Sequence, residues 1–518
     1  MAAREYLEGR KLAPAILGRV LVLGLGKSGR AAAEYCLDLL GGRVEELAVA
    51  AGAPSGEAEA WAEAARARGA VVLFDHEAIE GSYDVCIASP GISQLSDFYR
   101  SAEAASAEVV SEVEFAWRES ASDAKWVAVT GTNGKTTTTY LVEHIARVAG
   151  KRTGVIGTVG IRIGDEAEKS AHTTPESPDL QQLLARMRDA RCDVVAMEVS
   201  SHALDLDRTW DAAFAVTAFS NLTQDHLDYH HTFEAYFEAK ARLFSKDYPA
   251  KRVICIDDKW GKELLRRCSV AEDSVVTTGF DPSAQIHPVD VQYAPTHTTV
   301  TLDVRGSLHT FDYPLVGKFN VENVMCAFGI GLQLGFPAET IVEALEEAPQ
   351  IPGRLERVSA PNTGGVSVFV DYAHTPDALE KALASIMALT PGRTVCVFGC
   401  GGDRDASKRP IMGKAALAAD HAVVTSDNPR TEDPQAIIED IVSGMSSGAG
   451  RFEVEADRRA AIARAIAQAK PGDSILIAGK GHEDYQLVGD QVLSFDDRIV
   501  AAEELACAFG DEPSGEDR

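Results

Sequence analysis

The chain has 518 residues, of which 45% are hydrophobic and 25% charged, a composition typical of a folded protein rather than a disordered one. Its 50 basic and 78 acidic residues give a formal net charge of −28, which argues against nucleic acid or an anionic membrane as a partner. The length exceeds what one hydrophobic core supports and predicts about three domains.

Cysteine usage and the first apolar run both indicate a cytoplasmic protein. The nine cysteines lie scattered between Cys36 and Cys507 without paired zinc spacing, which is typical of reduced thiols. The apolar run over residues 13–26 is broken by Arg19, is too short to cross a bilayer and has no cleavage site after it. We therefore expect neither a signal peptide nor membrane insertion.

The first predicted domain, residues 1–121, alternates strands and helices in a Rossmann-like order. The expected strands cover residues 19–24, 71–74 and 85–88. The expected helices cover residues 30–40 and 57–68. Gly24, Gly26 and Gly29 form a turn between the first strand and helix, which serves either close helix packing or the binding of a UDP group. The second strand lacks the acidic residue of a dinucleotide site, so the turn is weak support for NAD.

The second predicted domain, residues 122–353, opens with an apolar strand over residues 126–130 and a second glycine loop. The loop and the start of the following helix consist of Gly131, Thr132, Asn133, Gly134, Lys135, Thr136 and Thr137. Backbone amides at a helix start can cradle phosphates while a lysine reaches the terminal phosphate, so this loop predicts ATP binding. Thr136 is expected to ligate magnesium.

Two further strands of this domain end in polar side chains. Glu198 follows an apolar strand over residues 193–197, and His226 follows the strand over residues 214–219. Strand ends of this kind border the nucleotide crevice of open α/β sheets, so Glu198 and His226 are candidate magnesium ligands. For His202, a hydrogen bond within its loop is the favoured interpretation.

The third predicted domain, residues 354–510, is again a doubly wound α/β unit, and residues 511–518 are expected to form a flexible tail. Its expected strands cover residues 366–370, 394–398, 422–425 and 474–477. Polar groups that follow these strands are Asp371, Arg404, Asp427, Asn428, Arg430, Gly479 and Glu483. Carboxylates beside a rigidly placed arginine suit the ammonium and carboxylate of an amino acid, although turns explain some of these residues equally well.

Five ordered motifs together resemble the Mur ligase family. They cover residues 130–136, 198–203, 221–228, 371–376 and 479–483. The resemblance implies a three-domain architecture with a Rossmann-like first domain, a central P-loop ATPase-like domain and a Rossmann-like third domain. It also implies a magnesium-dependent ATP ligase of cell-wall peptidoglycan synthesis that works through an acyl phosphate. Residues 427–430 resemble the signature of the branch that adds meso-diaminopimelate to UDP-N-acetylmuramoyl-L-alanyl-D-glutamate.

The resemblance also assigns roles residue by residue. It implies catalytic roles for Lys135, Lys240 and His226, and magnesium ligation by Thr136, Glu198, His226 and a carbamylated Lys240. Beyond the glycine loop, the implied ATP contacts are Asn323, Arg354 and Asp371. The implied muramyl-peptide contacts are Thr173, Thr174, Ser200 and Arg208. The implied contacts of the incoming diamino acid are Arg404, Asp427, Asn428, Arg430, Gly479 and Glu483.

The first domain departs from this branch. Its glycine turn and residues 89–92 resemble the D-glutamate-adding branch instead, and Leu206 stands where many relatives carry glutamine. The alternative function is therefore D-glutamate addition to UDP-N-acetylmuramoyl-L-alanine. Because the third domain receives the amino acid in this family, diaminopimelate addition is favoured. A dehydrogenase, a non-catalytic UDP-sugar sensor and folate-linked polyglutamate synthesis are more distant alternatives, and we expect a monomer.

Overall fold

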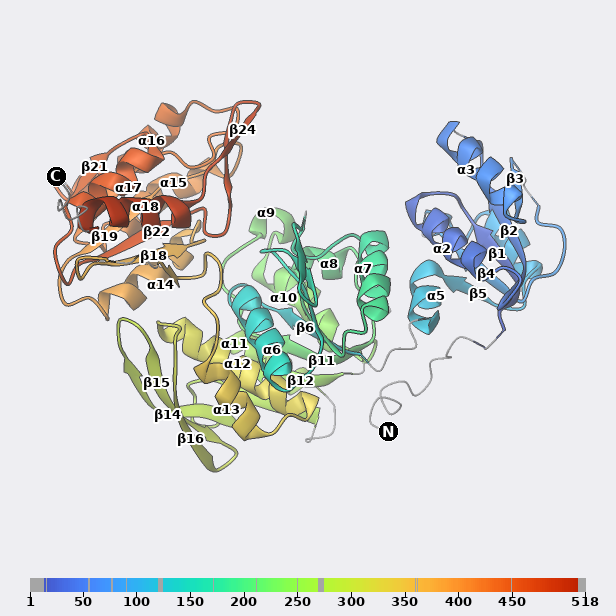
Figure 1. Cartoon of the computed structure of the whole chain (residues 1–518), viewed down its shortest axis with the longest axis horizontal. Coiled ribbons are helices and arrows are strands. Elements are labelled where there is room, and N and C mark those ends of the chain that lie inside the picture. Colours follow the sequence, from blue (N-terminus) through green and yellow to red (C-terminus); the bar gives the residue numbers. More distant parts are fainter. Residues whose placement is uncertain are drawn as a thin grey trace, which may run out of the picture.

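The computed structural model describes residues 14–510 except 15, 55, 76–77, 90, 120–123, 171, 211, 249, 269–273, 359, 361 and 449. Three units, each built on its own β-sheet, follow one another along the chain, and the central unit lies between the other two (Figure 1). This confirms the expected α/β architecture. The predicted boundary at residues 121 and 122 and the predicted tail at 511–518 lie outside the described residues, as does Pro90 of the 89–92 motif.

The N-terminal unit is a parallel sheet of strand order β3-β2-β1-β4-β5 with helices between the strands. Its strands are β1 (Gly18–Leu23), β2 (Val44–Ala51), β3 (Val71–Phe74), β4 (Val85–Ala88) and β5 (Val109–Ser111). Its helices are α2 (Lys27–Asp38), α3 (Gly56–Ala67), α4 (Asp97–Ala104) and α5 (Glu112–Glu119). Helix α2 begins three residues before the predicted start, because the extended Gly26 directly precedes it as N-cap.

The central unit has an eleven-stranded sheet of order β16-β15-β14-β13-β12-β11-β6-β10-β7-β8-β9. Its strands are β6 (Lys125–Thr130), β7 (Thr153–Ile156), β8 (Ile161–Ile163), β9 (Glu166–Glu168), β10 (Val194–Glu198), β11 (Phe214–Phe219), β12 (Lys251–Cys255), β13 (Val275–Thr278), β14 (Ile286–Tyr293), β15 (Thr298–Val304) and β16 (Ser307–Tyr313). Its helices are α6 (Lys135–Val148), α7 (Ser177–Asp189), α8 (Ser201–Asp205), α9 (Leu227–His230), α10 (Phe233–Ala241), η1 (Arg242–Phe244), α11 (Lys259–Arg267), α12 (Lys318–Leu334) and α13 (Ala338–Glu346).

Parallel strands form the middle of this sheet, and an antiparallel strand series closes each end. The carboxyl ends of β6, β10 and β11 therefore lie side by side. Gly131 follows β6, Glu198 is the last residue of β10, and the segment that leads to His226 follows β11.

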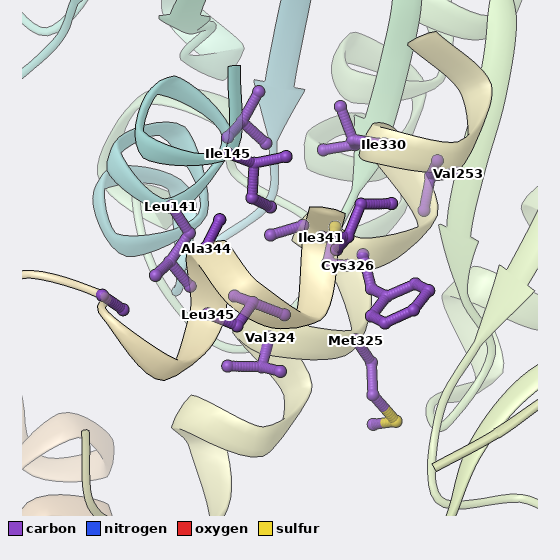
Figure 2. Close-up of a cluster of buried hydrophobic side chains, with 14 of the residues drawn as sticks. Leu141, Ile145, Val253, Val324, Met325, Cys326, Ile330, Ile341, Ala344 and Leu345 are labelled. Carbon is purple, nitrogen blue, oxygen red and sulfur yellow. The ribbon is translucent and has the colours of Figure 1, made fainter. Parts of the chain in front are cut away.

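A buried apolar cluster fixes the helix that follows the glycine loop (Figure 2). Leu141 and Ile145 of α6 pack against side chains from α12 and α13, and these helices cover the sheet at Val253. Figure 2 shows Val324, Met325, Cys326, Ile330, Ile341, Ala344 and Leu345 in this cluster, all essentially inaccessible to solvent. Tight apolar packing of this kind makes α6 a rigid support for Lys135 at its first turn.

The C-terminal unit is built on a sheet of order β17-β18-β22-β19-β20-β21, parallel except for β17. Its strands are β17 (Glu356–Arg357), β18 (Ser367–Asp371), β19 (Thr394–Phe398), β20 (His421–Val424), β21 (Phe452–Val454) and β22 (Ser474–Ala478), with a separate hairpin of β23 (Tyr485–Val488) and β24 (Gln491–Ser494). Its helices are α14 (Pro376–Met387), η3 (Ala406–Lys408), α15 (Arg409–Ala416), α16 (Pro434–Ser443), η4 (Ser446–Gly448), α17 (Arg458–Ala467) and α18 (Asp497–Phe509).

Polar contacts join the three units. Lys27 of the N-terminal unit pairs with Asp179 at the start of α7. On the other side, Lys169 Nζ lies 2.6 Å from Asp484 Oδ2, and Thr223 Oγ1 donates to Asp377 Oδ2 at 3.3 Å. All nine cysteines belong to the described part of the chain and are free thiols, as predicted. Among the described helices, none combines the length and the apolar character that crossing a membrane requires.

Candidate active site

The glycine loop between β6 and α6 holds Lys135 against its own backbone. Lys135 Nζ donates to the carbonyl oxygens of Gly131 and Thr132, both at 3.0 Å. Gly131 and Gly134 have φ values of 152° and 85°, a region that favours glycine. A Cβ on Gly131 would lie 2.0 Å from Ser220 Oγ, and one on Gly134 would lie 2.2 Å from Asn323 Oδ1. Both glycines are therefore required by the close approach of the β11 end and of α12.

Side chains from outside the loop fix its shape. Asn133 N donates to Asn221 Oδ1 at 2.9 Å, and Ser220 Oγ donates to the Asn133 carbonyl at 2.6 Å. Thr132 Oγ1 shares a hydrogen bond of 3.2 Å with the hydroxyl of Tyr236. Thr136 and Thr137 are buried at the first turn of α6. The loop is thus preorganised to present backbone amides to an anion.

Glu198 stands at the end of β10 and is 1% exposed. Its Oε1 accepts from Thr158 N at 2.8 Å, and its Oε2 accepts from Thr158 Oγ1 at 3.1 Å. A Cβ on Gly157 would lie only 2.4 Å from Oε1, so glycine is needed where this carboxylate approaches the chain. Each carboxylate oxygen has a second lone pair, which leaves Glu198 able to ligate a cation.

His226 follows β11 in a left-handed conformation with φ of 53°. Burial lowers the pKa of its imidazole to about 4, with a further contribution from the charges of Lys135 and Lys240, while Asp225 opposes the fall. The ring lies edge-on to His202, with ring centroids 4.8 Å apart. A neutral imidazole is the form that binds a metal ion.

Lys240, on α10, is buried with 1% exposure. Its Nζ donates to the Gly131 carbonyl at 2.8 Å and lies 4.7 Å from the ring centroid of Tyr236. Burial, and secondarily the charge of Lys135, lowers the pKa of Lys240 well below its usual range. An amine in this setting is available unprotonated, which is the form that carbamylation would require.

Two residues of this cluster were missing from the predicted site. The charge of Asp225 acts on Lys135, His226 and Lys240. Tyr236 touches Thr132 through its hydroxyl and Lys240 through its ring. Asp225 could have been found from its place next to His226 at a strand end, whereas nothing in the sequence singled out Tyr236.

Arg354 links the central and C-terminal units at the helix start that follows the glycine loop. Its Nη2 donates to Thr136 Oγ1 at 3.1 Å, and its guanidinium carbon lies 4.8 Å from the ring centroid of Tyr372. Asp371 accepts from Leu355 N at 2.6 Å and from Ala373 N at 2.8 Å, so it fixes the backbone on both sides of Arg354 and Tyr372. Burial raises the pKa of Asp371, and Arg354 opposes that rise.

The predicted muramyl-peptide contacts cluster beside Glu198. Thr174 Oγ1 donates to the Glu198 carbonyl and accepts from Ser200 N, both at 3.0 Å. Arg208 Nη1 donates to the Thr174 carbonyl at 3.1 Å, and Thr173 Oγ1 lies 3.0 Å from Thr158 Oγ1. The structure therefore brings these four residues together, while their contacts with a substrate stay a prediction. Leu206 is 52% exposed near them.

The C-terminal unit gathers a second polar cluster at the ends of β20 and β22. Asn428 Nδ2 donates to Glu483 Oε2 at 2.8 Å, and Arg430 Nη1 donates to the Gly402 carbonyl at 2.7 Å. A Cβ on Gly479 would lie 2.4 Å from Asp427 Oδ2, which explains this glycine. Burial raises the pKa of Glu483, and Lys480 opposes the rise. Asp427, Asn428, Gly479 and Glu483 thus lie together, at the pocket that the resemblance assigns to the incoming amino acid.

Two further residues near this cluster, one predicted and one not, differ in their surroundings. Arg404 is exposed, and its Nη1 donates to the carbonyl of the preceding Asp403 at 3.3 Å, so its contact with an amino acid stays a prediction. Lys480, which was assigned no role from the sequence, is fully buried and donates to Asn428 Oδ1 at 3.0 Å and Glu483 Oε2 at 3.3 Å. Its place inside the 479–483 motif was the available signal.

Comparison with known proteins identifies the family. Residues 129–331 match the Mur ligase middle domain, and residues 353–481 match the Mur ligase, glutamate ligase domain. The chain belongs to the Mur ligase family. Curated relatives of this Mur ligase include the UDP-N-acetylmuramoyl-L-alanyl-D-glutamate–2,6-diaminopimelate ligases of Thermosynechococcus vestitus and Gloeobacter violaceus. The first is 48% identical over 381 residues, and the second is 48% identical over 380 residues; each match covers 73% of this chain and 76% of the relative.

Solved structures also agree with the assignment of this chain to the Mur ligase family. A UDP-N-acetylmuramoyl-L-alanyl-D-glutamate–2,6-diaminopimelate ligase superposes with a TM-score of 0.61 and 31% identity, covering 89% of this chain and 92% of that chain. A UDP-N-acetylmuramate–alanine ligase from Thermotoga maritima superposes with a TM-score of 0.53 and 18% identity, covering 94% of this chain and 98% of that chain. The second likeness concerns the fold alone.

Proposed function

We propose that this Mur ligase adds meso-diaminopimelate to UDP-N-acetylmuramoyl-L-alanyl-D-glutamate, using ATP and forming ADP and phosphate. Relatives 48% identical to the chain are named 2,6-diaminopimelate ligases, which favours this function over D-glutamate addition. Mur ligase folds and a folylpolyglutamate synthase complexed with ADP are among the structural neighbours, in keeping with ATP as the co-substrate.

The observation that carries the proposal is that two different polar sites lie on either side of the linker between α13 and β17. The central unit presents a glycine loop with Lys135 and Lys240, and the C-terminal unit presents Asp427, Asn428 and Glu483. Arg354 reaches from the linker to Thr136 of the first site. A phosphate-binding loop beside an amino-acid pocket is what an amide-forming ATP ligase requires.

Magnesium fits the residues that the resemblance assigns to it. Thr136, Glu198 and His226 supply a hydroxyl, a carboxylate and a neutral imidazole, and Gly157 leaves room where a Cβ would press on the carboxylate. When bound, Mg²⁺ would neutralise charge on the phosphate oxygens. A carbamate on the unprotonated Lys240 would add a second anionic ligand.

In the first proposed step, a terminal carboxylate oxygen of the substrate attacks the γ-phosphorus of ATP. The bond to the β–γ bridging oxygen breaks, ADP leaves with that electron pair, and an acyl phosphate forms. Lys135 and the amides of the glycine loop stabilise charge on the transferred group, because they are held in place before the reaction. Arg354 adds a further cation from the C-terminal side.

In the second proposed step, the neutral amine of diaminopimelate attacks the acyl carbon, phosphate leaves and the new amide loses one proton. Asp427, Asn428 and Glu483 would orient the amino acid, with Arg430 and Arg404 as cations for its carboxylates. Thr173, Thr174, Ser200 and Arg208 would hold the muramyl peptide beside the glycine loop.

We further propose domains at residues 1–121, 122–353 and 354–510, with UDP binding in the first, ATP in the second and the amino acid in the third. The N-terminal unit would then grip the UDP group through the turn at Gly26. A monomer in the cytoplasm, serving cell-wall synthesis and hence cell shape and division, is the setting that fits this activity.

A substrate matrix tests the proposal. Phosphate release from ATP and magnesium is measured with UDP-N-acetylmuramoyl-L-alanine or its D-glutamyl dipeptide, each combined with D-glutamate, meso-diaminopimelate or L-lysine. Turnover is expected with the dipeptide and diaminopimelate, with the product confirmed by its mass. Turnover with the shorter substrate and D-glutamate would replace the proposed function by the alternative.

A further inference from the structure

Lys480 lies deeper than the carboxylates of the pocket that it contacts. Its side chain is 0% exposed, while those of Asp427 and Glu483 are 9% and 16% exposed. A molecule entering the pocket can therefore reach the two carboxylates but not the lysine. A buried amino group without partners would be costly, so these contacts compensate for the burial of Lys480.

The ammonium of Lys480 organises three acceptors at once. Its Nζ lies 3.0 Å from Asn428 Oδ1, 3.3 Å from Glu483 Oε2 and 3.8 Å from Asp427 Oδ1. Asn428 Oδ1 also accepts from Leu487 N at 2.9 Å, so two donors fix the amide oxygen. The amide nitrogen must then face Glu483, to which it donates at 2.8 Å. Lys480 thereby sets the orientation of Asn428 as well as the position of Glu483.

Charge balance gives the arrangement a second effect. Burial raises the pKa of Glu483, and Lys480 opposes that rise. The lysine therefore favours the anionic carboxylate, which is the form that would attract the ammonium of an incoming amino acid. Charged and titratable groups facing Glu483 also include Asp427, Arg458, Tyr372 and Tyr485.

We propose that Lys480 is a positioning residue for the incoming amino acid, holding the amide of Asn428 and the carboxylate of Glu483 in the arrangement that binds an ammonium group. This inference rests on the proposed function, because it takes the pocket to be the amino-acid site. It assigns Lys480 no contact with substrate and no part in the transfer of the phosphoryl group.

The test compares Lys480→Met with the wild type, using steady-state kinetics with diaminopimelate as the varied substrate between pH 7 and 9. At pH 7 the variant should raise KM for diaminopimelate by about tenfold or more, the effect of removing one partner of a buried charge pair. The KM values for ATP and the UDP substrate should stay within about twofold, because the glycine loop is untouched. The defect should shrink toward pH 9, because Glu483, relieved of Lys480, ionises again at higher pH.

Controls separate positioning from damage to the fold. Lys414→Met removes an exposed lysine on α15 of the same unit and should match the wild type. Lys480→Met should raise KM for diaminopimelate by a smaller factor in the Glu483→Gln background than in the wild type, because the part of its effect that acts through that carboxylate is already lost and only the orientation of Asn428 remains. If Lys480→Met folds poorly, Lys480→Arg keeps the charge and should retain a KM closer to the wild type than Lys480→Met.

A KM for diaminopimelate that stays unchanged in Lys480→Met would overturn the inference, as would a pH-independent loss with kcat and KM for ATP altered in parallel. Failure of the proposed function itself is distinguishable, because the wild type would then show no turnover with diaminopimelate at any pH. Ultraviolet circular dichroism of each variant accompanies the kinetics.

Discussion

Two buried lysines, one in each of the two sites, have opposite surroundings. Lys240 of the central unit meets the Gly131 carbonyl and the ring of Tyr236, and burial lowers its pKa well below the usual range. Lys480 of the C-terminal unit lies against Asn428 and the carboxylates of Asp427 and Glu483. The first environment favours a neutral amine, whereas the second provides partners for an ammonium.

The contrast shows how partners, rather than burial, decide what a lysine can do. A neutral amine can react, and at the nucleotide site a carbamate on Lys240 would convert a cation into a magnesium ligand. A paired ammonium is unreactive but holds its neighbours in one arrangement. These surroundings suit the proposed chemistry on ATP at the central site and the proposed recognition of an amino acid at the C-terminal site.

The sharpest challenge to this contrast is Lys240→Met. Loss of the proposed magnesium ligand should lower kcat by about 10²- to 10³-fold, the size of effect seen when a charge-stabilising group is removed. KM for diaminopimelate should change by no more than about twofold, because the C-terminal pocket keeps its contacts. Steady-state kinetics measures both, and ¹³C-bicarbonate labelling should give a carbamate resonance in the wild type that the variant lacks.

Lys246→Met, which replaces an exposed lysine of the same unit, is the matched control. Lys240 would have no special role if both variants kept wild-type kcat. A carbamate signal that persisted in Lys240→Met would place the modification elsewhere.

Arg458→Met tests the dependence of the C-terminal site on paired charges. Arg458 and Asp497 form an ion pair with 0% exposure, and Arg458 Nη2 also donates to the Ala478 carbonyl at 3.0 Å, just before Gly479. Removing the arginine leaves a buried carboxylate unpaired and should cost about 3–5 kcal/mol of unfolding free energy. Denaturant unfolding of the whole protein measures the loss, while ADP binding provides an internal reference for the central unit.

The double variant Arg458→Met/Asp497→Leu should recover much of that loss, because replacing both partners removes the unpaired charge. If the single variant is as stable as the wild type, buried pairing contributes little to this unit.

Sequence patterns predicted the architecture well where strands are continuously apolar. The strands β3, β4, β11 and β19 have the predicted bounds, since each is a short, largely apolar run, although only Val72 of β3 is buried. The antiparallel series β14 to β16 was not placed, because β15 alternates buried and half-buried positions and reads as polar. Apolar runs therefore predict parallel strands such as β3 and β4, whereas the alternating antiparallel strands of the central unit are missed.

The candidate site was predicted unevenly for a similar reason. Strand-end motifs led to Glu198, His226 and Asp427, since parallel strands bring their carboxyl ends together. The roles of Tyr236 and Lys480 depend on partners distant in sequence, Thr132 and Asn428, which only the fold brings near. Local pattern contains no information about such pairs.

Gly26→Ala tests whether the N-terminal glycine turn binds a ligand. Unlike the two lysine sites, this turn could serve helix packing alone. A Cβ on Gly26 would meet nothing within 4 Å, and φ is −66°, so the fold does not require glycine there. A Cβ on Gly29, by comparison, would lie 2.2 Å from the Gly24 carbonyl oxygen. If UDP approaches Gly26, the variant should raise KM for the UDP substrate about three- to tenfold, with stability within about 0.5 kcal/mol of the wild type.

An unchanged KM for the UDP substrate in Gly26→Ala would mean that the turn serves helix packing alone. Gly29→Ala is the comparison that should lose stability whichever role the turn has, because its Cβ meets backbone.

The smallest effect concerns pH. Burial and the charges of Arg354 and Arg498 lower the pKa of His482, the neighbour of Glu483, to about 4. The unfolded chain takes up this proton below about pH 6.5, whereas the folded protein does not until about pH 4, so stability falls as pH drops through that window. His482→Gln should reduce the fall by no more than about 1 kcal/mol, since the ring is partly exposed and solvent screens it.

Thermal unfolding at pH 7, 5.5 and 4.5 measures that change, with the exposed His172 as control in His172→Gln. If stability falls with pH equally in the wild type and His482→Gln, the half-buried imidazole of His482 does not contribute to that fall.

The most direct measurement is the fate of oxygen during the reaction. The dipeptide substrate is labelled with ¹⁸O in its terminal carboxylates and incubated with ATP, magnesium and meso-diaminopimelate, and the released phosphate is analysed by mass spectrometry. The proposed acyl phosphate predicts one ¹⁸O in each phosphate formed, together with ADP and a product heavier than the labelled dipeptide by diaminopimelate minus two hydrogens and one ¹⁸O. Phosphate without ¹⁸O, or release of AMP and pyrophosphate, would contradict the account.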